Sequence, residues 1–228
     1  MSSSAAPFFA RWRFLVLTLL MCAWLLLMPL VGGAWRVELL LEAFMLITLL
    51  VTVWANPNWS SLRNALIVLW LLSISGTLLS IATADHPAWR WSRTLEVLTL
   101  VPLMGLLAGG MLAFVLRERK LTFDSIFATI AAYLLVAGMF TQIYMCLLTW
   151  NPASFSLPFG VAGRPVHLLQ ADMTYFSLVT LATVGYGDVL PATSTARMLA
   201  MIQAVTGQFY IAVVVAIFVG AYSSQRRN

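Results

Sequence analysis

The chain has 228 residues, of which 61% are hydrophobic and only 9% are charged, whereas soluble domains carry about 25% charged residues. This composition excludes an ordinary soluble protein and predicts one that lies mostly within a membrane. The formal net charge is +5. Because the basic residues sit between apolar runs, we interpret them as topology signals and lipid contacts rather than as a nucleic-acid surface.

Runs of about 20 apolar residues, the length that crosses a bilayer as a helix, mark the candidate transmembrane segments. The first four cover residues 14–31, 37–55, 62–84 and 93–116. The fifth begins near Thr122, which can cap a helix, and carries no charge from residue 125 to residue 150. The sixth covers residues 196–222. We predict six transmembrane helices, with a four-helix bundle in residues 1–120 and a second domain in residues 121–228.

The region between the fifth and sixth runs is not a further transmembrane helix. Residues 151–170 are polar and rich in Pro and Gly, so we expect an exposed outer turret. Residues 171–182 are too few to span the bilayer. We expect a short helix there, followed by a non-helical loop with the sequence Thr183-Val184-Gly185-Tyr186-Gly187-Asp188.

The loop has the composition that a cage of backbone carbonyls requires. A protein that removes water from a cation must offer oxygens in its place, and backbone carbonyls supply them densely. Successive carbonyls face one side only where some residues leave the usual backbone regions, which Gly185 and Gly187 do without a Cβ. The β-branched Thr183 and Val184 are expected to stiffen the rest, and the Thr183 hydroxyl can add an innermost ring of oxygens. One strand cannot surround an ion, so the chain must assemble around an axis.

Residues 173–183, the loop and residues 198–222 together resemble the pore region of tetrameric potassium channels. The resemblance implies an all-α membrane protein with a re-entrant pore helix and a selectivity-filter loop between the fifth and sixth transmembrane helices. It also implies a homotetrameric pore, with K⁺ ions in the filter and no other cofactor. The filter residues would be Thr183, Val184, Gly185, Tyr186 and Gly187, and K⁺ would bind to the oxygens of the first four.

The same resemblance suggests how the filter is supported at its outer end. Asp188 stands where the family keeps a carboxylate behind the outer mouth, and Tyr175 could donate a hydrogen bond to it. Some bacterial relatives carry a glutamate at the position of Val179, so here a single carboxylate is expected to replace a carboxyl pair. Leu190 stands at the outer mouth, where channels that are sensitive to external tetraethylammonium typically carry an aromatic ring, so we expect weak external block.

The sixth run contains the expected gating elements. Gly207 lies twenty residues after Gly187, at the hinge position of the family, although a glycine there can also serve simple helix packing. Val215, Val219 and Ser223 follow at helical spacing and would line the inner gate. An apolar ring of this kind can close a pore by dewetting.

The four-helix bundle resembles a voltage sensor without its gating charges. Arg90 and Arg93 have the required spacing, but residues 94–116 contain no basic residue. Since steep gating needs several charges to move through the field, we predict that the bundle is not a voltage sensor. Its acidic residues Glu38, Glu42 and Glu96 are expected to form interfacial ion pairs with Arg36, Arg90 and Arg93, or alternatively a cluster that senses protons or a ligand.

Charge asymmetry predicts the orientation. With six helices, eight of the 13 basic residues fall on the side of the termini and five on the other, which places both termini in the cytoplasm. The compact layout resembles that of channels of a bacterial inner membrane.

We expect a K⁺-selective channel that conducts passively. The alternatives are a silent or regulatory subunit that needs a partner, and a K⁺ transporter subunit. The sequence shows no cluster of His, Cys and carboxylate residues that would favour an enzyme.

Overall fold

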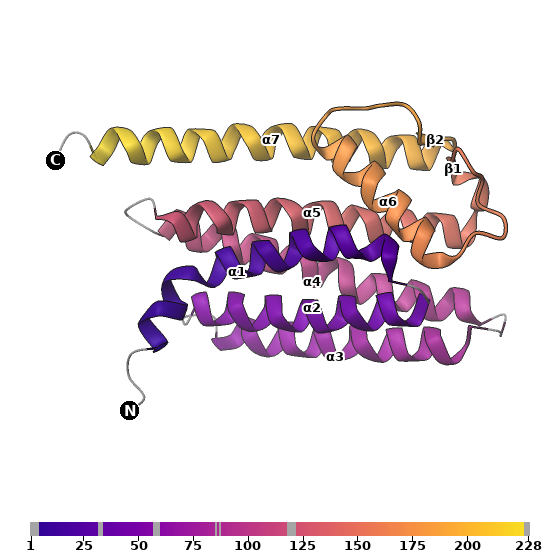
Figure 1. Ribbon diagram of the computed structural model, residues 1–228, viewed down its shortest axis with the longest axis horizontal. Helices are drawn as coiled ribbons and strands as arrows, with labels where there is room; N and C mark the ends of the chain where they lie inside the picture. Colours follow the sequence, from indigo (N-terminus) through magenta and orange to yellow (C-terminus); the bar gives the residue numbers. More distant parts are fainter. Residues whose placement is uncertain are drawn as a thin grey trace.

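The computed structural model describes residues 5–31, 34–56, 60–84, 86, 88–117 and 122–225, and these are almost entirely helical (Figure 1). The elements in chain order are α1 (Ala5–Leu27), η1 (Met28–Leu30), α2 (Ala34–Ala55), α3 (Ser60–Ala82), α4 (Trp89–Arg117), α5 (Phe123–Trp150), η2 (Pro152–Ser154), β1 (Phe155–Ser156), α6 (Val166–Leu181), β2 (Leu190–Pro191) and α7 (Ser194–Gln225).

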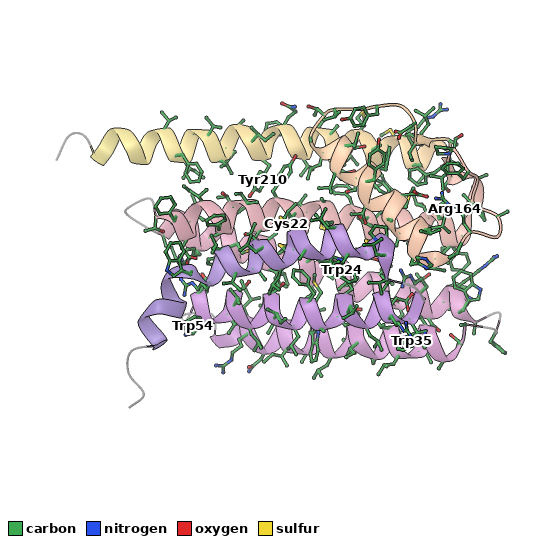
Figure 2. The ribbon with its side chains drawn as sticks, viewed as in Figure 1. Cys22, Trp24, Trp35, Trp54, Arg164 and Tyr210 are labelled. Carbon is green, nitrogen blue, oxygen red and sulfur yellow. The ribbon has the colours of Figure 1, made fainter. Side chains whose placement is uncertain are left out.

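Six helices of the described part are long and apolar enough to cross a membrane, so the prediction of six such helices is confirmed. The qualifying segments are Trp12–Leu30, Trp35–Ala55, Leu62–Ala82, Trp89–Arg117, Phe123–Trp150 and Ser194–Gly220. Trp35 and Trp54 lie at opposite ends of α2 and are about half exposed (Figure 2). This placement fits side chains that lie at the two surfaces of a bilayer.

Every long helix except α5 begins earlier than the sequence suggested, and the cause is clear for α6 and α4. α6 starts at Val166 rather than near residue 171, directly after Pro165. Its first turn contains the polar His167 and Gln170, so the sequence pattern assigned this turn to the turret. α4 starts at Trp89 rather than at residue 93, because Arg90 and Arg93 interrupt the apolar pattern of its first turn. The turret is therefore shorter than predicted.

α5 lies between the four-helix bundle on one side and α7 on the other (Figure 1). The main core joins α1, α2 and α4 to α5 and includes the fully buried Phe14, Leu103, Leu107 and Leu135. The bundle therefore packs against α5 of its own chain. The connection after α4 includes residues 118–121, so the predicted domain boundary after residue 120 lies outside the described residues.

The first turn of α5 is fixed by two side chains. The Thr122 hydroxyl accepts a hydrogen bond of 3.1 Å from the Ser125 N–H, so the predicted cap is present. The buried carboxylate of Asp124 accepts hydrogen bonds from Arg13 Nε at 3.2 Å and from the Phe14 N–H at 3.0 Å. These contacts attach α1 to the start of α5.

A second core holds α6 against the C-terminal half of α5. Tyr144 of α5 is fully buried, and its ring centroid lies 5.3 Å from that of Phe155 and 5.2 Å from that of Phe176, both in edge-on geometry. Such aromatic contacts add specific geometry to the burial of apolar area. The cluster therefore positions α6, and with it the loop that follows, relative to α5.

Candidate functional site

The loop after α6 returns to the end of the molecule at which α6 begins (Figure 1). It leaves α6 near the middle of α7 and ends in β2, which pairs antiparallel with β1 so that Phe155 is opposite Pro191. A further hydrogen bond of 2.8 Å runs from the Ala192 N–H to the Ser154 carbonyl. The two ends of the loop are therefore held by separate elements.

The sign of the backbone angle φ alternates along the loop. Thr183, Gly185 and Gly187 have φ angles of 57°, 59° and 80°, while Val184 and Tyr186 between them keep negative φ. Alternation of right- and left-handed residues turns successive N–H groups to one side of a chain, which leaves the carbonyls on the other. The alternating signs of φ in residues 183–187 meet this requirement for a row of carbonyl oxygens.

The positive φ of Thr183 adds a third residue to the two glycines that were expected to leave the usual backbone regions. A β-branched residue rarely adopts this conformation. Here the cause is the end of α6, since the Thr183 N–H donates to the Thr180 carbonyl at 3.0 Å and the Val184 N–H to the Val179 carbonyl at 2.9 Å. These are the two bonds of a Schellman motif, in which the residue after the cap is left-handed. The helix cap thus sets the first residue of the loop.

Residues 182–188 are all exposed within one chain. The side chain of Tyr186 is 71% exposed, and a Cβ at Gly185 or Gly187 would meet no atom within 4 Å. A strained, non-helical strand that its own chain leaves uncovered is not explained by the stability of a single subunit.

Asp188 accepts two hydrogen bonds at the C-terminal end of the loop. The Tyr175 hydroxyl donates to its Oδ2 at 2.7 Å, which is the contact expected from the sequence, and the Val189 N–H donates to its Oδ1 at 3.0 Å. The ring of Tyr175 also lies parallel to that of Tyr186, with centroids 6.3 Å apart. Val179 contributes through its backbone carbonyl, as described above, rather than through its side chain.

Comparisons with known proteins match this region. The family described as "Ion channel" matches residues 165–224, which cover α6, the loop and α7. The chain is 33% identical over 79 residues to the potassium channel protein kcv of Paramecium bursaria Chlorella virus 1, and the match covers 35% of this chain and 80% of that protein. The chain belongs to the potassium channel family.

Two other relatives match different shares of the chain. Protein LctB of Geobacillus stearothermophilus is 34% identical over 122 residues, which are 53% of this chain and 89% of that protein. Two-pore potassium channel 4 of Arabidopsis thaliana is 46% identical, but the match spans only 19% of this chain and 15% of that protein. No solved structure matches the chain.

Replacing Tyr175 with Phe removes the hydrogen bond to Asp188 and keeps the ring that stacks on Tyr186. The hydrogen bond to Asp188 raises the pKa of Tyr175 from 10 to about 12, so the hydroxyl donates throughout the physiological range. Because the folded-state pKa is raised, the bond is fully present below pH 10 and is lost as the pH rises through about 12. In single-channel recordings we expect the variant to lose K⁺ current sooner during sustained opening, with unchanged selectivity. Unchanged current decay, or lost selectivity, would contradict this role of the hydrogen bond.

A buried polar network, which the sequence analysis missed, joins three helices of the channel. The Tyr144 hydroxyl donates to Gln203 Oε1 at 2.6 Å, and Gln203 Nε2 lies 3.0 Å from the Ser177 carbonyl and 2.6 Å from Ser177 Oγ. Ser177 Oγ in turn donates to the Ala137 carbonyl at 2.7 Å. The available signal was Gln203 itself, an amide inside a long apolar run. The network fixes α6 between α5 and α7.

Gly207 is a point of close approach between α7 and the end of α6. A Cβ built there would lie 2.1 Å from the Leu181 carbonyl oxygen and 3.0 Å from its carbon. α7 runs as one helix from Ser194 to Gln225, through this contact. Farther along, the Tyr210 side chain lies between α7 and α5, and its hydroxyl donates to the Thr129 carbonyl (Figure 2). Packing thus explains Gly207, and its role as a hinge stays a prediction.

The predicted gate and outer-mouth residues are not brought together within one chain. Val215 and Val219 are more than half exposed on α7, and the side chain of Ser223 lies outside the described ones. Leu190 is half exposed in β2, opposite Ser156. Their roles depend on assembly and stay predictions.

Arg93, Glu42 and Glu96 of the bundle are buried, and Arg93 forms two of the ion pairs that were expected. Arg93 is 5% exposed and lies 2.9 Å from both Glu38 and Glu96, while Glu42 accepts hydrogen bonds from Ser73 and Thr77 at 2.6 and 3.0 Å. Gly76 permits this burial, because α3 and α4 approach so closely that a Cβ there would lie 3.1 Å from the Cα of Glu96. Arg36 and Arg90 are exposed, and neither forms an ion pair with another described residue. Across the described ranges, no group of three or more His, Cys, Asp or Glu residues could hold a metal ion.

Proposed function

We propose that four copies of the chain form a K⁺-selective channel that conducts ions passively through a filter made of Thr183, Val184, Gly185, Tyr186 and Gly187. The observation that carries the proposal is the alternating backbone of residues 183–187, which turns a row of carbonyls to one side of an otherwise uncovered strand. Such carbonyls can replace the hydration shell of K⁺. The filter requires no cofactor besides the ions.

The homotetramer is supported by the apolar surface that one chain leaves open. α7 exposes Met198, Ile202, Val205, Phe209 and Val213. Only 11% of its membrane-length apolar segment is buried within one chain. α6 is too short to span a bilayer, and the loop returns to the end where α6 begins, which fits a re-entrant segment. Non-helical backbone at membrane depth is tolerated only where protein or a water-filled cavity surrounds it. Neighbouring subunits around a central axis would supply both.

The proposed location is a bacterial inner membrane with both termini in the cytoplasm. The charge asymmetry of the sequence supports the orientation, and the relatives include bacterial proteins. The exposed apolar side chains of α1 to α4 would contact lipid.

The test is K⁺ flux into liposomes that contain only the purified protein. We expect K⁺ entry, and a reversal potential under K⁺/Na⁺ bi-ionic conditions that shows a strong preference for K⁺. Equal permeability of the two ions would contradict the filter assignment. Flux that appears only after a second channel protein is added would mean a regulatory subunit, and flux against a K⁺ gradient would mean a transporter.

Open probability should depend only weakly on voltage. Among the described residues of α4, Arg93 is the one buried basic residue, and it forms ion pairs with Glu38 and Glu96. Moving one charge across the membrane field contributes about 2.3 kcal/mol per 100 mV, and steep gating needs several such charges. Activation curves of the reconstituted channel should therefore correspond to at most about one moving charge per subunit. A steep curve would show that the bundle does move charge.

A further inference from the structure

A small cavity lies where the four-helix bundle, α5 and α6 meet. It has a volume of about 50 Å³, and residues of α1, α2, α4, α5 and α6 line it. The residues from α6 are Gln170, Thr174 and Leu178, which follow one another at intervals of four and so share one face of the helix. The cavity walls that the structure describes include none of the residues 183–188. The cavity therefore lies on a side of α6 away from the filter loop.

Two buried side-chain amides in the wall of this cavity have unused hydrogen-bonding groups. Gln142 of α5 is 1% exposed and Gln170 of α6 is 6% exposed. The Oε1 atom of each has no hydrogen-bond partner among the described residues. Burial of an amide group without a partner is costly. Two such amides in one cavity indicate a bound molecule that supplies the hydrogen bonds.

The other polar groups of the cavity restrict the chemistry of that molecule. Thr141 donates to the Ala137 carbonyl at 3.0 Å, and Thr174 donates to the Gln170 carbonyl at 2.7 Å. Each of these hydroxyls has used its hydrogen and keeps a lone pair. The free oxygens of the cavity are therefore acceptors, so the bound molecule must be a donor. None of the described residues that line the cavity is ionisable, which favours a neutral molecule.

The volume of the cavity limits the size of the molecule. A water needs at least about 10–15 Å³, whereas a cavity of about 150 Å³ holds benzene. The cavity of about 50 Å³ is thus large enough for a few waters or one short alcohol and too small for an aromatic ring. Apolar side chains such as Met45, Met104 and Leu135 form much of the wall, so a methyl group is tolerated. A purely apolar cavity would stay dry, but two to four polar groups suffice to hold a water.

We propose that this cavity binds a small neutral hydroxyl compound, which hydrogen-bonds the amides of Gln142 and Gln170 and joins α5 to α6 on the side away from the filter. A hydroxyl group both donates and accepts, so it can satisfy an amide through the oxygen or through the nitrogen. Water and a short alcohol share this chemistry. The site lies within one chain, so the inference goes beyond the proposed conduction and does not depend on it.

Nuclear Overhauser contacts to the glutamine side chains test the site directly. In purified protein labelled with nitrogen-15 at glutamine alone, we expect long-lived water to give cross-peaks to the amides of Gln142 and Gln170. The variants Gln142→Met and Gln170→Met identify the two signals. Gln203 is the internal control, because its buried amide is already bonded to Tyr144 and Ser177 and should give no such cross-peak.

Titration with methanol separates the two sources of the hydroxyl group. Methyl cross-peaks that replace those of water at Gln142 and Gln170 would identify a site for a short alcohol. Water cross-peaks that persist unchanged would identify a water site. Both outcomes support a hydroxyl compound in the cavity, and the absence of both kinds of cross-peak overturns the proposal.

Gly138→Ala takes space from the cavity without altering either amide. Its Cβ would lie 3.5 Å from Met104 Cε and 3.8 Å from Met104 Sδ, which are ordinary contacts. We expect the cross-peaks at both amides to weaken or disappear. The matched control is Gly105→Ala in α4, whose Cβ would lie 3.7 Å from Met139 Sδ, away from the cavity. Unchanged cross-peaks in Gly138→Ala, or equal weakening in Gly105→Ala, would place the bound molecule elsewhere and overturn the proposal.

The sign of the change in stability gives a second test of the site. Replacing a buried amide that has no partner with an apolar side chain of the same length stabilises a protein or is neutral, whereas removing one contact of a bound molecule destabilises it. We expect Gln142→Met and Gln170→Met each to lower the thermal unfolding midpoint by about 2–4 °C. The double variant should lose little more than either single variant, because the two amides share one bound molecule. An unchanged or higher midpoint, or fully additive losses, would overturn the shared site.

Discussion

Replacing Gly185 with alanine should abolish selective K⁺ conduction. Gly185 has a φ of 59°, in the left-handed region, and a Cβ there would meet no atom within 4 Å of its own chain. The penalty therefore comes from the backbone conformation itself, which costs a residue with a Cβ about 1–2 kcal/mol, or about 4–8 kcal/mol over four subunits. The strand would relax toward negative φ and turn a carbonyl out of the row. Bi-ionic reversal potentials and single-channel conductance measure the loss.

The turret supplies a matched control for this substitution. Gly160 has a φ of 70°, and a Cβ added there, as at Gly185, would have no atom within 4 Å. Gly160→Ala carries the same backbone penalty outside the filter, so the variant should be less stable but should conduct with wild-type selectivity. A Gly185→Ala channel that still prefers K⁺, or a Gly160→Ala channel that loses the preference, would mean that strain in the filter is not what selectivity depends on.

Local sequence signals were sufficient for the six long helices and for the two glycines of the loop. Each long helix is a run of apolar residues whose length the bilayer dictates. The positive φ of Gly185 and Gly187 follows from the lack of a Cβ in a strand whose carbonyls must face one way. Both features depend on residues that are adjacent in the chain.

Features that depend on packing between distant residues could not be read in this way. The positive φ of Thr183 arises because α6 ends at Leu181, and a β-branched residue gives no sequence signal for such a conformation. The burial of Arg93 requires the close approach at Gly76, and the role of Gln203 requires Tyr144 and Ser177, which are 59 and 26 residues away in sequence. The ion pairs of Arg93 with Glu38 and Glu96 were among those expected from the sequence, whereas their burial and the partners of Gln203 were not.

Replacing Gly207 with alanine should prevent assembly of a conducting channel. The added Cβ would lie 2.1 Å from the Leu181 carbonyl oxygen. Relief requires a shift of α7 or of the end of α6, and the end of α6 carries the Schellman bonds that hold Thr183. Overpacking of a well-packed contact typically costs about 1–3 kcal/mol and occasionally more, here once in every subunit. We expect loss of the tetramer on size-exclusion chromatography and loss of K⁺ flux.

Two further variants distinguish this packing role from that of a hinge. Gly220→Ala lies in the same helix with no atom within 4 Å of the new Cβ, so it should assemble and conduct normally. Leu181→Ala combined with Gly207→Ala removes the side-chain contact at 3.2 Å but keeps the backbone clash, so it should not restore assembly. A hinge predicts a different outcome, in which Gly207→Ala forms a tetramer as stable as wild type and only its open probability falls, because alanine stiffens the helix. If that outcome is found, α7 must lie farther from Leu181 in the assembled channel, and Gly207 acts through bending rather than through contact.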